Sequence, residues 1–479
     1  MRSAPYAVAL LAGAASVLGF SPFDWFAVSL AALAVLIHLW LRSGRSAFLV
    51  GFWFGLGYFL AGVSWVYVSM HRFGAMPAPL AALATLGLCA FLALFPALAG
   101  WAQAKLRAPG AIPALWVLFE WLRGWILTGF PWLPVGNAAI DSPLAGFAPL
   151  GGVYLVSLAT MMSAGFLWLI AAGQSRWFAA AGFALIGISS AALSTVQWTT
   201  PSANPVSVSL LQGNVPQSLK FDPARYERIL ETYARLAEGS RAQLIVLPET
   251  AVPRFLDQVD RSFLNRLTAV AERNRGDLLL GVPMRAAPGV YFNGVVSTGV
   301  SPPAAYQKVH LVPFGEFVPP GFGWIVNVLS IPLSDFSRGR TDQRPLLAAG
   351  EQVAVNICYE DAYGVEIIRQ LPEATLLVNV SNVAWFGDSL APAQHLQIAR
   401  QRALETGRMH LTATNTGITA AISADGSVLA QLPQFAEGRL EVEARGRTGA
   451  TPYVRFGDWP ALVLCLLLLV GVALRGRSR

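Results

Sequence analysis

Apolar residues gather into long runs in the first 198 residues and again near the end of the chain. About 20 mostly apolar residues are enough to cross a bilayer as a helix. The candidate runs are 5–20, 25–41, 48–68, 79–102, 111–127, 153–172, 177–195 and 458–474. Gly51 and Gly55 stand four residues apart in the third run, a spacing that favours close packing of membrane helices. The pattern predicts a membrane α-helical bundle of about eight spans.

The middle of the chain, 199–455, follows a different pattern, in which short β-rich runs alternate with amphipathic helical ones. Helices are expected over 222–240, 261–275 and 391–408, and strands over 206–214, 243–250, 277–284, 291–299, 302–309, 351–360 and 374–382. A hairpin is expected over 411–426. Strand–helix alternation is typical of an α/β layered domain. We therefore predict a seven-span domain over 1–198, a soluble domain over 199–455, and a membrane helix with a basic tail over 456–479.

Composition and charge refine this picture. The chain is 54% hydrophobic and only 13% charged, whereas about a quarter of an average soluble domain is charged. The Lys and Arg residues beside the runs alternate in a way that marks cytoplasmic loops, so we read the net charge of +7 as an orientation signal and expect no nucleic-acid partner. The alternation places both termini in the cytoplasm and the domain 199–455 in the periplasm of a bacterium, with the chain as a multi-pass protein of the inner membrane.

Cysteine usage draws attention to one position. Of the three cysteines, Cys89 and Cys465 lie in predicted spans, so Cys358 is alone in the soluble domain. A lone cysteine is either a small buried apolar residue or a reactive group. Cys358 ends a strand and is followed by Glu360 and Asp361; their charges alone would raise the pKa of the thiol. A nearby cation would be needed to favour the nucleophilic thiolate.

Two further polar residues follow apolar, strand-like runs. Glu249 ends "LIVLPET" and could act as a base, although a carboxylate at a strand end also caps turns. Lys308 lies in "YQKVHLVPFGEFVP", with Glu316 eight residues later, and could hold an oxyanion, although a lysine there could also lie along an edge strand. Together with Cys358 they supply a base, a cation and a nucleophile for a thioester route.

The soluble domain resembles the nitrilase superfamily, and the whole chain resembles the bacterial apolipoprotein N-acyltransferase family. The likeness rests on "GFPWLPVGNAAIDSPLAGFAPLGG" in the N-terminal part and on "LQGNVPQSLKF", "LPETAVP", "KVHLVPFGEFVP", "NICYED" and "NVSNVAWFG" in the soluble domain. It implies a nitrilase-like αββα sandwich with Glu249 as general base, Lys308 as oxyanion stabiliser and Cys358 as nucleophile. The residues that it implies as supporting are Glu316, Tyr359 and Glu360. Phe221 departs from the tryptophan that follows the lysine in relatives, which puts one lipid contact in doubt.

The resemblance also implies two half-reactions. A membrane phospholipid, typically phosphatidylethanolamine, gives its sn-1 acyl chain to Cys358, and the thioester then acylates the α-amino group of a diacylglyceryl-cysteine lipoprotein. The apolar stretch 318–333 is expected to be a mobile lid that enters the bilayer, although it could also be a packed loop. Trp385 is expected near the site as a substrate contact, with core packing as the alternative.

Other functions remain open at this stage. A membrane-anchored amidase or nitrile hydrolase would use the same three residues with water as acceptor, but would not need eight spans. A transporter would need charged or broken helices along a path, and the apolar runs show few of either. The histidines do not cluster with acids or cysteines, so we expect no metal and no cofactor. We expect a monomer.

Overall fold

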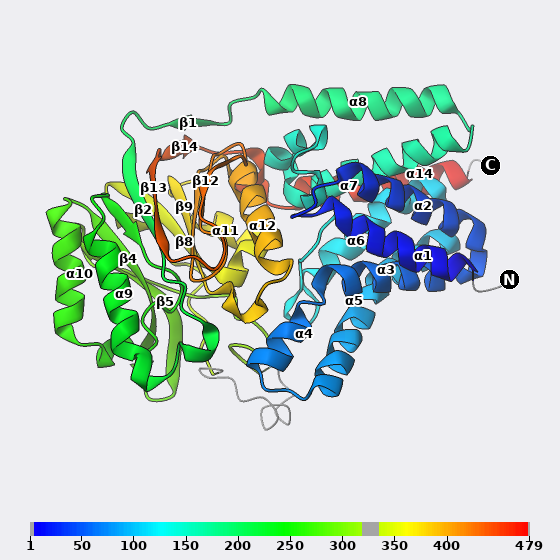
Figure 1. Ribbon diagram of the computed structural model, residues 1–479. Coiled ribbons are helices and arrows are strands. Elements are labelled where there is room, and N and C mark those ends of the chain that lie inside the picture. The colour runs from blue at the N-terminus through cyan, green and yellow to red at the C-terminus, as the bar shows by residue number, and fades with distance from the viewer. Residues whose placement is uncertain (1–3, 319–334, 478–479) are drawn as a thin grey trace. The chain divides into compact units, whose positions relative to one another are not determined.

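The structure is a computed structural model that describes residues 4–318 and 335–477 (Figure 1). Contacts divide the chain into two compact units. The first comprises Met1–Tyr67, Pro77–Gln197 and Arg455–Arg479, and the second comprises Val68–Met76 and Trp198–Val454. The second unit therefore includes a short segment from the first hundred residues.

The first unit is helical. Its helices are α1 (Ala4–Ser16), α2 (Phe26–Ser43), α3 (Ala47–Val63), α5 (Ala78–Leu106), α6 (Ile112–Arg123), α7 (Ala148–Ala171), α8 (Arg176–Ser194) and α14 (Trp459–Arg477). The short helices α4 (Val66–Val68) and α13 (Pro452–Phe456) lie where the chain passes from one unit to the other.

Among the described residues, four helical runs are long and apolar enough to cross a membrane. They are Phe26–Val63, Ala78–Leu106, Pro143–Ala171 and Arg176–Ser194. The apolar runs at Ala4–Gly19 and Trp459–Leu474 are shorter, and the predicted span 111–127 forms only the 12-residue helix α6. The helices fit a membrane protein, and the number of eight spans stays a prediction.

The predicted close packing at Gly51 and Gly55 is present in this unit. A Cβ on Gly51 would lie 2.4 Å from the carbonyl oxygen of Pro96, and one on Gly55 would lie 2.8 Å from Cα of Ala93. Helices α3 and α5 thus approach backbone to backbone, which only a residue without a side chain allows.

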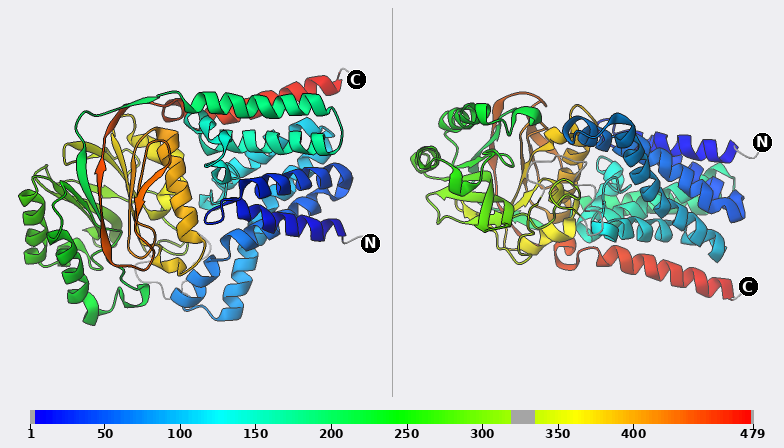
Figure 2. Two further views of the ribbon diagram at one scale, coloured as in Figure 1. Left: turned by 45° about the horizontal axis from the view of Figure 1, so that its top comes forward. Right: turned by 90° about the horizontal axis from the view of Figure 1, so that it is seen from below.

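Two six-stranded sheets form the centre of the second unit (Figure 2). One has the strand order β13 (Gly438–Ala444), β2 (Val206–Gln212), β3 (Leu244–Val246), β4 (Asp277–Ala287), β5 (Val290–Gly299) and β6 (Ala305–Gln307). The other has the order β12 (Val428–Gln431), β11 (Ala420–Ile422), β10 (His410–Thr414), β9 (Leu376–Ser381), β8 (Glu351–Ile357) and β7 (Leu346–Ala348). A separate pair joins β1 (Thr199–Pro201) to β14 (Arg447–Gly449).

Helices cover the outer faces of both sheets, so the unit has four layers. Apolar side chains from both sheets, such as Val208 and Val378, share one buried core between them. Helices α9 (Tyr226–Glu238) and α10 (Arg261–Arg273) bury their apolar faces on the first sheet. Helices α11 (Gly364–Ile367) and α12 (Ala391–Thr406) pack on the second. The layer order is therefore helix, sheet, sheet, helix.

Strand direction decides where functional residues can meet. Strands β2, β3 and β4 run parallel, and so do β8, β9 and β10. Strand β6 is antiparallel to β5, which is antiparallel to β4, so β6 ends at the same edge as β3. Carboxyl ends of strands in an open α/β sheet are the usual place for a ligand site.

Two strands end earlier than the sequence pattern predicts. The expected strand 243–250 is only β3, Leu244–Val246, because Pro248 has no N–H for the ladder and Thr250 has a left-handed φ of 49°. The expected strand 351–360 ends at Ile357, and a 3₁₀ turn over Cys358–Ala362 follows. Glu249 and Cys358 thus lie in tight turns that follow the strands.

Candidate active site

Glu249, Lys308 and Cys358 each follow the end of a strand at one edge of the sandwich. Glu249 comes three residues after β3, Lys308 comes directly after β6, and Cys358 comes directly after β8. Lys308 is 1% exposed and Glu249 is 7% exposed. The fold therefore brings together, in a buried place, side chains that are up to 109 residues apart in sequence.

The amino group of Lys308 lies between two carboxylates. Its Nζ is 2.9 Å from Glu316 and 3.4 Å from Oε1 of Glu249. Nδ2 of Asn293 donates to Oε1 of both carboxylates at 2.7 Å. Asn293 belongs to β5, and its carbonyl accepts the backbone N–H of Lys308 at 2.8 Å. The pairing of β5 with β6 thus positions both Lys308 and the Asn293 amide that binds the two carboxylates.

These contacts fix the charges of the group. Burial opposes the charge on Lys308, but Glu316 and Glu249 outweigh it, and the pKa of Lys308 is raised. Burial also opposes the charge on Glu249, but Lys308, the amide of Asn293 and the backbone N–H of Asn382 lower its pKa. Glu249 is therefore a carboxylate at neutral pH, able to accept a proton, beside a lysine that is charged at the same pH.

Cys358 occupies a strained backbone position. Its φ of 54° is in the left-handed region that non-glycine residues rarely adopt. Two buried side chains hold its carbonyl oxygen: Nδ2 of Asn379 at 3.2 Å and Nε2 of His395 at 3.1 Å. A strained residue kept in place by its surroundings often marks a functional position.

The thiol of Cys358 is held in its protonated form. Burial raises its pKa, the charges of Glu249 and Glu316 raise it further, and the charge of Lys308 opposes them. The charges of both Glu249 and Lys308 therefore act on the thiol. For this thiol to act as a nucleophile, its proton would have to pass to a base. Glu249 is the carboxylate with the largest influence on it.

Glu360 holds the backbone on either side of the site. Its carboxylate accepts the backbone N–H groups of Ile357 at 2.7 Å, Val309 at 2.6 Å and His310 at 3.0 Å. Burial raises the pKa of Glu360 to about 7, and the charge of Lys308 and these N–H groups oppose that rise. The side chain thus ties the residue before Cys358 to the residue after Lys308.

Tyr359 and Trp385, the other expected supporting residues, lie in aromatic contacts. Tyr359 is buried, and its hydroxyl accepts a hydrogen bond from Tyr363 at 3.1 Å. Trp385 follows Asn382 in a 3₁₀ turn over Val383–Phe386, and its ring meets Phe73 edge to face at 6.0 Å between centroids. Phe73 lies in the segment Val68–Met76, which belongs to this unit.

Three residues that contact Glu249 were not among the sequence candidates. They are Asn293, Asn382 and Lys220. Lys220 is 2% exposed and donates to the carbonyl oxygen of Glu249 at 3.1 Å. The signal for Asn293 is a polar residue inside an apolar strand, and the signal for Lys220 is its rarity, since the chain has only three lysines. Asn382 acts on Glu249 through its backbone N–H at 2.8 Å, which no side-chain pattern reveals.

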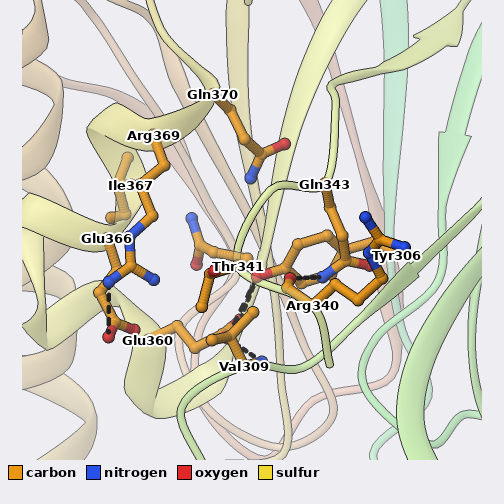
Figure 3. A pocket seen from close by; sticks show the side chains of 11 residues that line it. Tyr306, Val309, Arg340, Thr341, Gln343, Glu360, Glu366, Ile367, Arg369 and Gln370 are labelled. Atoms are coloured by element: carbon orange, nitrogen blue, oxygen red, sulfur yellow. Dashed lines mark hydrogen bonds and ion pairs between the residues drawn. The ribbon is translucent and has the colours of Figure 1, made fainter. Parts of the chain in front are cut away.

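A polar pocket lies beside Glu360. Its lining residues are Tyr306, Val309, Arg340, Thr341, Gln343, Asn356, Glu360, Glu366, Ile367, Arg369 and Gln370 (Figure 3). Within the part of the chain that the structure describes, Glu249, Lys308 and Cys358 are not among them. The pocket therefore adjoins the site through Glu360 and Val309 but does not include Glu249, Lys308 or Cys358. The predicted lid 318–333 lies outside the described residues except for Val318.

Comparisons with known proteins match both parts of the chain. Residues 12–166 match the family model of the apolipoprotein N-acyltransferase N-terminal domain, and residues 207–453 match that of carbon-nitrogen hydrolases. The chain is 52% identical to an apolipoprotein N-acyltransferase of Nitrosomonas europaea, over 98% of this chain and 97% of that protein. It is 44% identical to the corresponding protein of Chromobacterium violaceum, over 98% and 94%. A carbon-nitrogen hydrolase structure from Helicobacter pylori G27 matches with a TM-score of 0.38 and 19% identity, over 54% of this chain and 94% of that one.

Proposed function

Because this chain belongs to the apolipoprotein N-acyltransferase family, we propose that it moves an acyl chain from a membrane phospholipid to the N-terminal amino group of a lipoprotein. The observation that carries the chemistry is the meeting of an ionised Glu249, a charged Lys308 and the thiol of Cys358 at one edge of the sandwich. A base, a cation and a nucleophile are the groups that acyl transfer through a thioester requires.

In the first half-reaction, the sulfur of Cys358 attacks the carbonyl carbon of the sn-1 ester of the donor, for which we propose phosphatidylethanolamine. The thiol proton passes to Glu249 as the carbon–sulfur bond forms. The charge of Lys308 stabilises the oxyanion of the tetrahedral intermediate. The bond to the glycerol oxygen then breaks, Glu249 returns the proton to that oxygen, and a lysophospholipid leaves.

In the second half-reaction, the α-amino group of a diacylglyceryl-cysteine attacks the thioester carbon. The new carbon–nitrogen bond forms, the carbon–sulfur bond breaks, and the proton of the amine passes through Glu249 to the sulfur of Cys358. The enzyme returns to its starting state without any cofactor or metal in this scheme. Both half-reactions use the same base and the same oxyanion site, which is the logic of a ping-pong transferase.

The supporting residues have separate tasks in this proposal. Glu316 keeps Lys308 charged and in place through the 2.9 Å contact between them. Glu360 fixes the backbone that carries Lys308 and Cys358. Tyr359 packs behind the nucleophile, and Trp385 contacts the acyl chain of the donor.

The membrane arrangement is part of the same proposal. Apolar helices precede and follow the domain in the sequence, and a phospholipid donor requires the nucleophile to be near the bilayer. We place the domain 199–455 in the periplasm, the helices 1–198 and 456–479 in the inner membrane, both termini in the cytoplasm, and the protein as a monomer.

The proposal is tested with purified full-length protein in detergent, phosphatidylethanolamine and a diacylglyceryl lipopeptide with a free amino terminus. We expect the lipopeptide to gain one acyl chain for each lysophospholipid released, and Cys358→Ser to abolish both products. Cys465→Ser, which changes a buried cysteine of the helical unit, is the matched control and should retain transfer. Release of free fatty acid with an unmodified lipopeptide would instead identify a hydrolase.

A further inference from the structure

The chain has three lysines, and two of them are buried beside Glu249. Lys308 is explained by its contacts with two carboxylates. Lys220 is not explained in this way, because its hydrogen bond goes to a backbone carbonyl, that of Glu249, at 3.1 Å. Burying an ammonium group is unfavourable unless charges compensate it, so the presence of Lys220 at 2% exposure requires a reason.

The segment that carries Lys220 is fixed to the active site at two points. It forms a 3₁₀ turn over Gln217–Leu219, which Lys220 terminates. The side chain of Asn382 donates to Oε1 of Gln217 at 2.8 Å, while its backbone N–H donates to Oε2 of Glu249 at 2.8 Å. Lys220 then binds the carbonyl of the same glutamate. The ammonium group is thus held in a defined position beside the base.

The charge balance around Cys358 gives the reason. Glu249 and Glu316 contribute two negative charges and Lys308 contributes one positive charge, which leaves a net negative field that opposes a thiolate. The charge of Lys220 interacts with both Glu249 and Cys358 and offsets one of these negative charges. A positive charge near a thiol favours its ionised, nucleophilic form.

We propose that Lys220 is a positioning residue whose charge favours the thiolate of Cys358, both when the thiol attacks the donor and when it leaves the acyl group. The inference rests on the proposed function for its catalytic meaning. Its effect on the thiol can be measured without any lipid. The alternative is a purely structural lysine that only satisfies the carbonyl of Glu249.

The ionisation of Lys220 distinguishes an electrostatic effect on the thiol from a purely structural hydrogen bond. Burial lowers the pKa of Lys220 to about 8, while the charges of Glu249 and Cys358 oppose that fall. The other titratable groups around Glu249 and Cys358 include Lys308, Glu316, Glu360 and His395. Lys308 and Glu316 are linked to Glu249 directly or through Asn293. The pKa of Glu360 is about 7, and burial lowers the pKa of His395, so neither accounts for a change between about pH 7.5 and pH 9.5. Lys220 is therefore charged at about pH 7 and mostly neutral at about pH 9.5, so its effect on the thiol should disappear over that range.

The experiment is the rate of alkylation of Cys358 by iodoacetamide in the full-length protein, followed by mass spectrometry. Lys220→Met removes the charge and the hydrogen bond, Lys220→Gln removes only the charge, and Lys220→Arg keeps the charge. Lys105→Met is the matched control, because Lys105 is the exposed third lysine.

At about pH 7 we expect alkylation of Lys220→Met and Lys220→Gln to be about tenfold slower than in the wild type, the effect of one unit in the pKa of the thiol. The difference should shrink toward none at about pH 9.5, where wild-type Lys220 is neutral. Lys220→Arg should stay faster than Lys220→Gln at both values, and Lys105→Met should match the wild type.

The inference would be overturned if Lys220→Gln were alkylated at the wild-type rate at neutral pH. It would also be overturned if the variant were slower than the wild type by the same factor at every pH. If Lys220→Met does not fold, the alkylation rates of Lys220→Gln and Lys220→Arg still show whether the charge acts on the thiol, because both side chains retain a donor for the carbonyl of Glu249. Failure of acyl transfer in the wild type with the alkylation pattern intact would refute the proposed function and leave this inference standing.

Discussion

Gly281 offers a direct test of whether the position of Glu249 controls the reaction. This residue lies in β4, against the turn that carries Glu249. A Cβ at this position would lie 2.2 Å from the carbonyl oxygen of Pro248 and 2.8 Å from Cα of Glu249. Carbon–oxygen contacts normally lie at about 3.3 Å or more, so Gly281→Ala should displace the turn by about 1 Å.

The displacement would alter the contact between Glu249 and Lys308, which is already long for an ion pair. Oε1 of Glu249 is already 3.4 Å from Nζ of Lys308, and a misplacement of about 1 Å at a reacting group can cost about 10²-fold in rate. Overpacking of this kind also costs about 1–3 kcal/mol in the free energy of unfolding. We therefore expect Gly281→Ala to fold, with a modest loss of stability, and to lose about 10²-fold in acyl transfer.

Gly438→Ala is the matched control. Gly438 lies in β13 of the same sheet, and a Cβ there would meet only Leu432, at 3.5 Å. The measurements are initial rates of lysophospholipid release and thermal unfolding in the same detergent. If Gly281→Ala were folded and within twofold of Gly438→Ala in rate, the position of Glu249 would not control the reaction and its role as base would be refuted.

Other substitutions test the remaining parts of the site. Asn293→Ala removes a donor that lowers the pKa of Glu249, so that pKa should rise and the acid limb of the pH–rate profile should move to higher pH; an unchanged limb would argue against Glu249 as the base. Lys308→Met leaves Glu316 and Glu249 buried without their cation, so chemical denaturation should show a loss of about 3–5 kcal/mol, and lysophospholipid release should stop; normal release would exclude the lysine as oxyanion stabiliser. Trp385→Ala should raise KM for the phospholipid several-fold with little change in kcat, and the reverse pattern would contradict its contact with the donor.

The sequence pattern was sufficient to predict elements whose signal is local. The helix expected over 391–408 is α12, Ala391–Thr406. Within it, Arg402 and Glu405 form an i, i+3 ion pair at 2.9 Å. The expected hairpin over 411–426 is the antiparallel pair β10 and β11. Periodicity and side-chain spacing contain this information, because they depend only on neighbours along one element.

Long-range pairing and backbone contacts could not be predicted in the same way. Strand β13 pairs with β2 across more than 200 residues, and no local pattern in either strand selects the other. Glu360 looked like an acid that would oppose a thiolate, yet its carboxylate binds the backbone N–H groups of Ile357, Val309 and His310. Glu249 and Glu316 are the carboxylates that raise the pKa of Cys358. Such roles depend on where the chain folds back, which a single sequence does not encode locally.

The central claim is that Cys358 carries the acyl chain, and intact mass tests it most directly. Purified full-length protein is incubated with phosphatidylethanolamine and no acceptor, and its mass is measured before and after treatment with hydroxylamine. The account predicts a gain of one acyl chain that maps to Cys358, is released by hydroxylamine and is absent in Cys358→Ser but present in Cys465→Ser. A folded protein that releases lysophospholipid without any adduct, or an adduct at another residue, would contradict it.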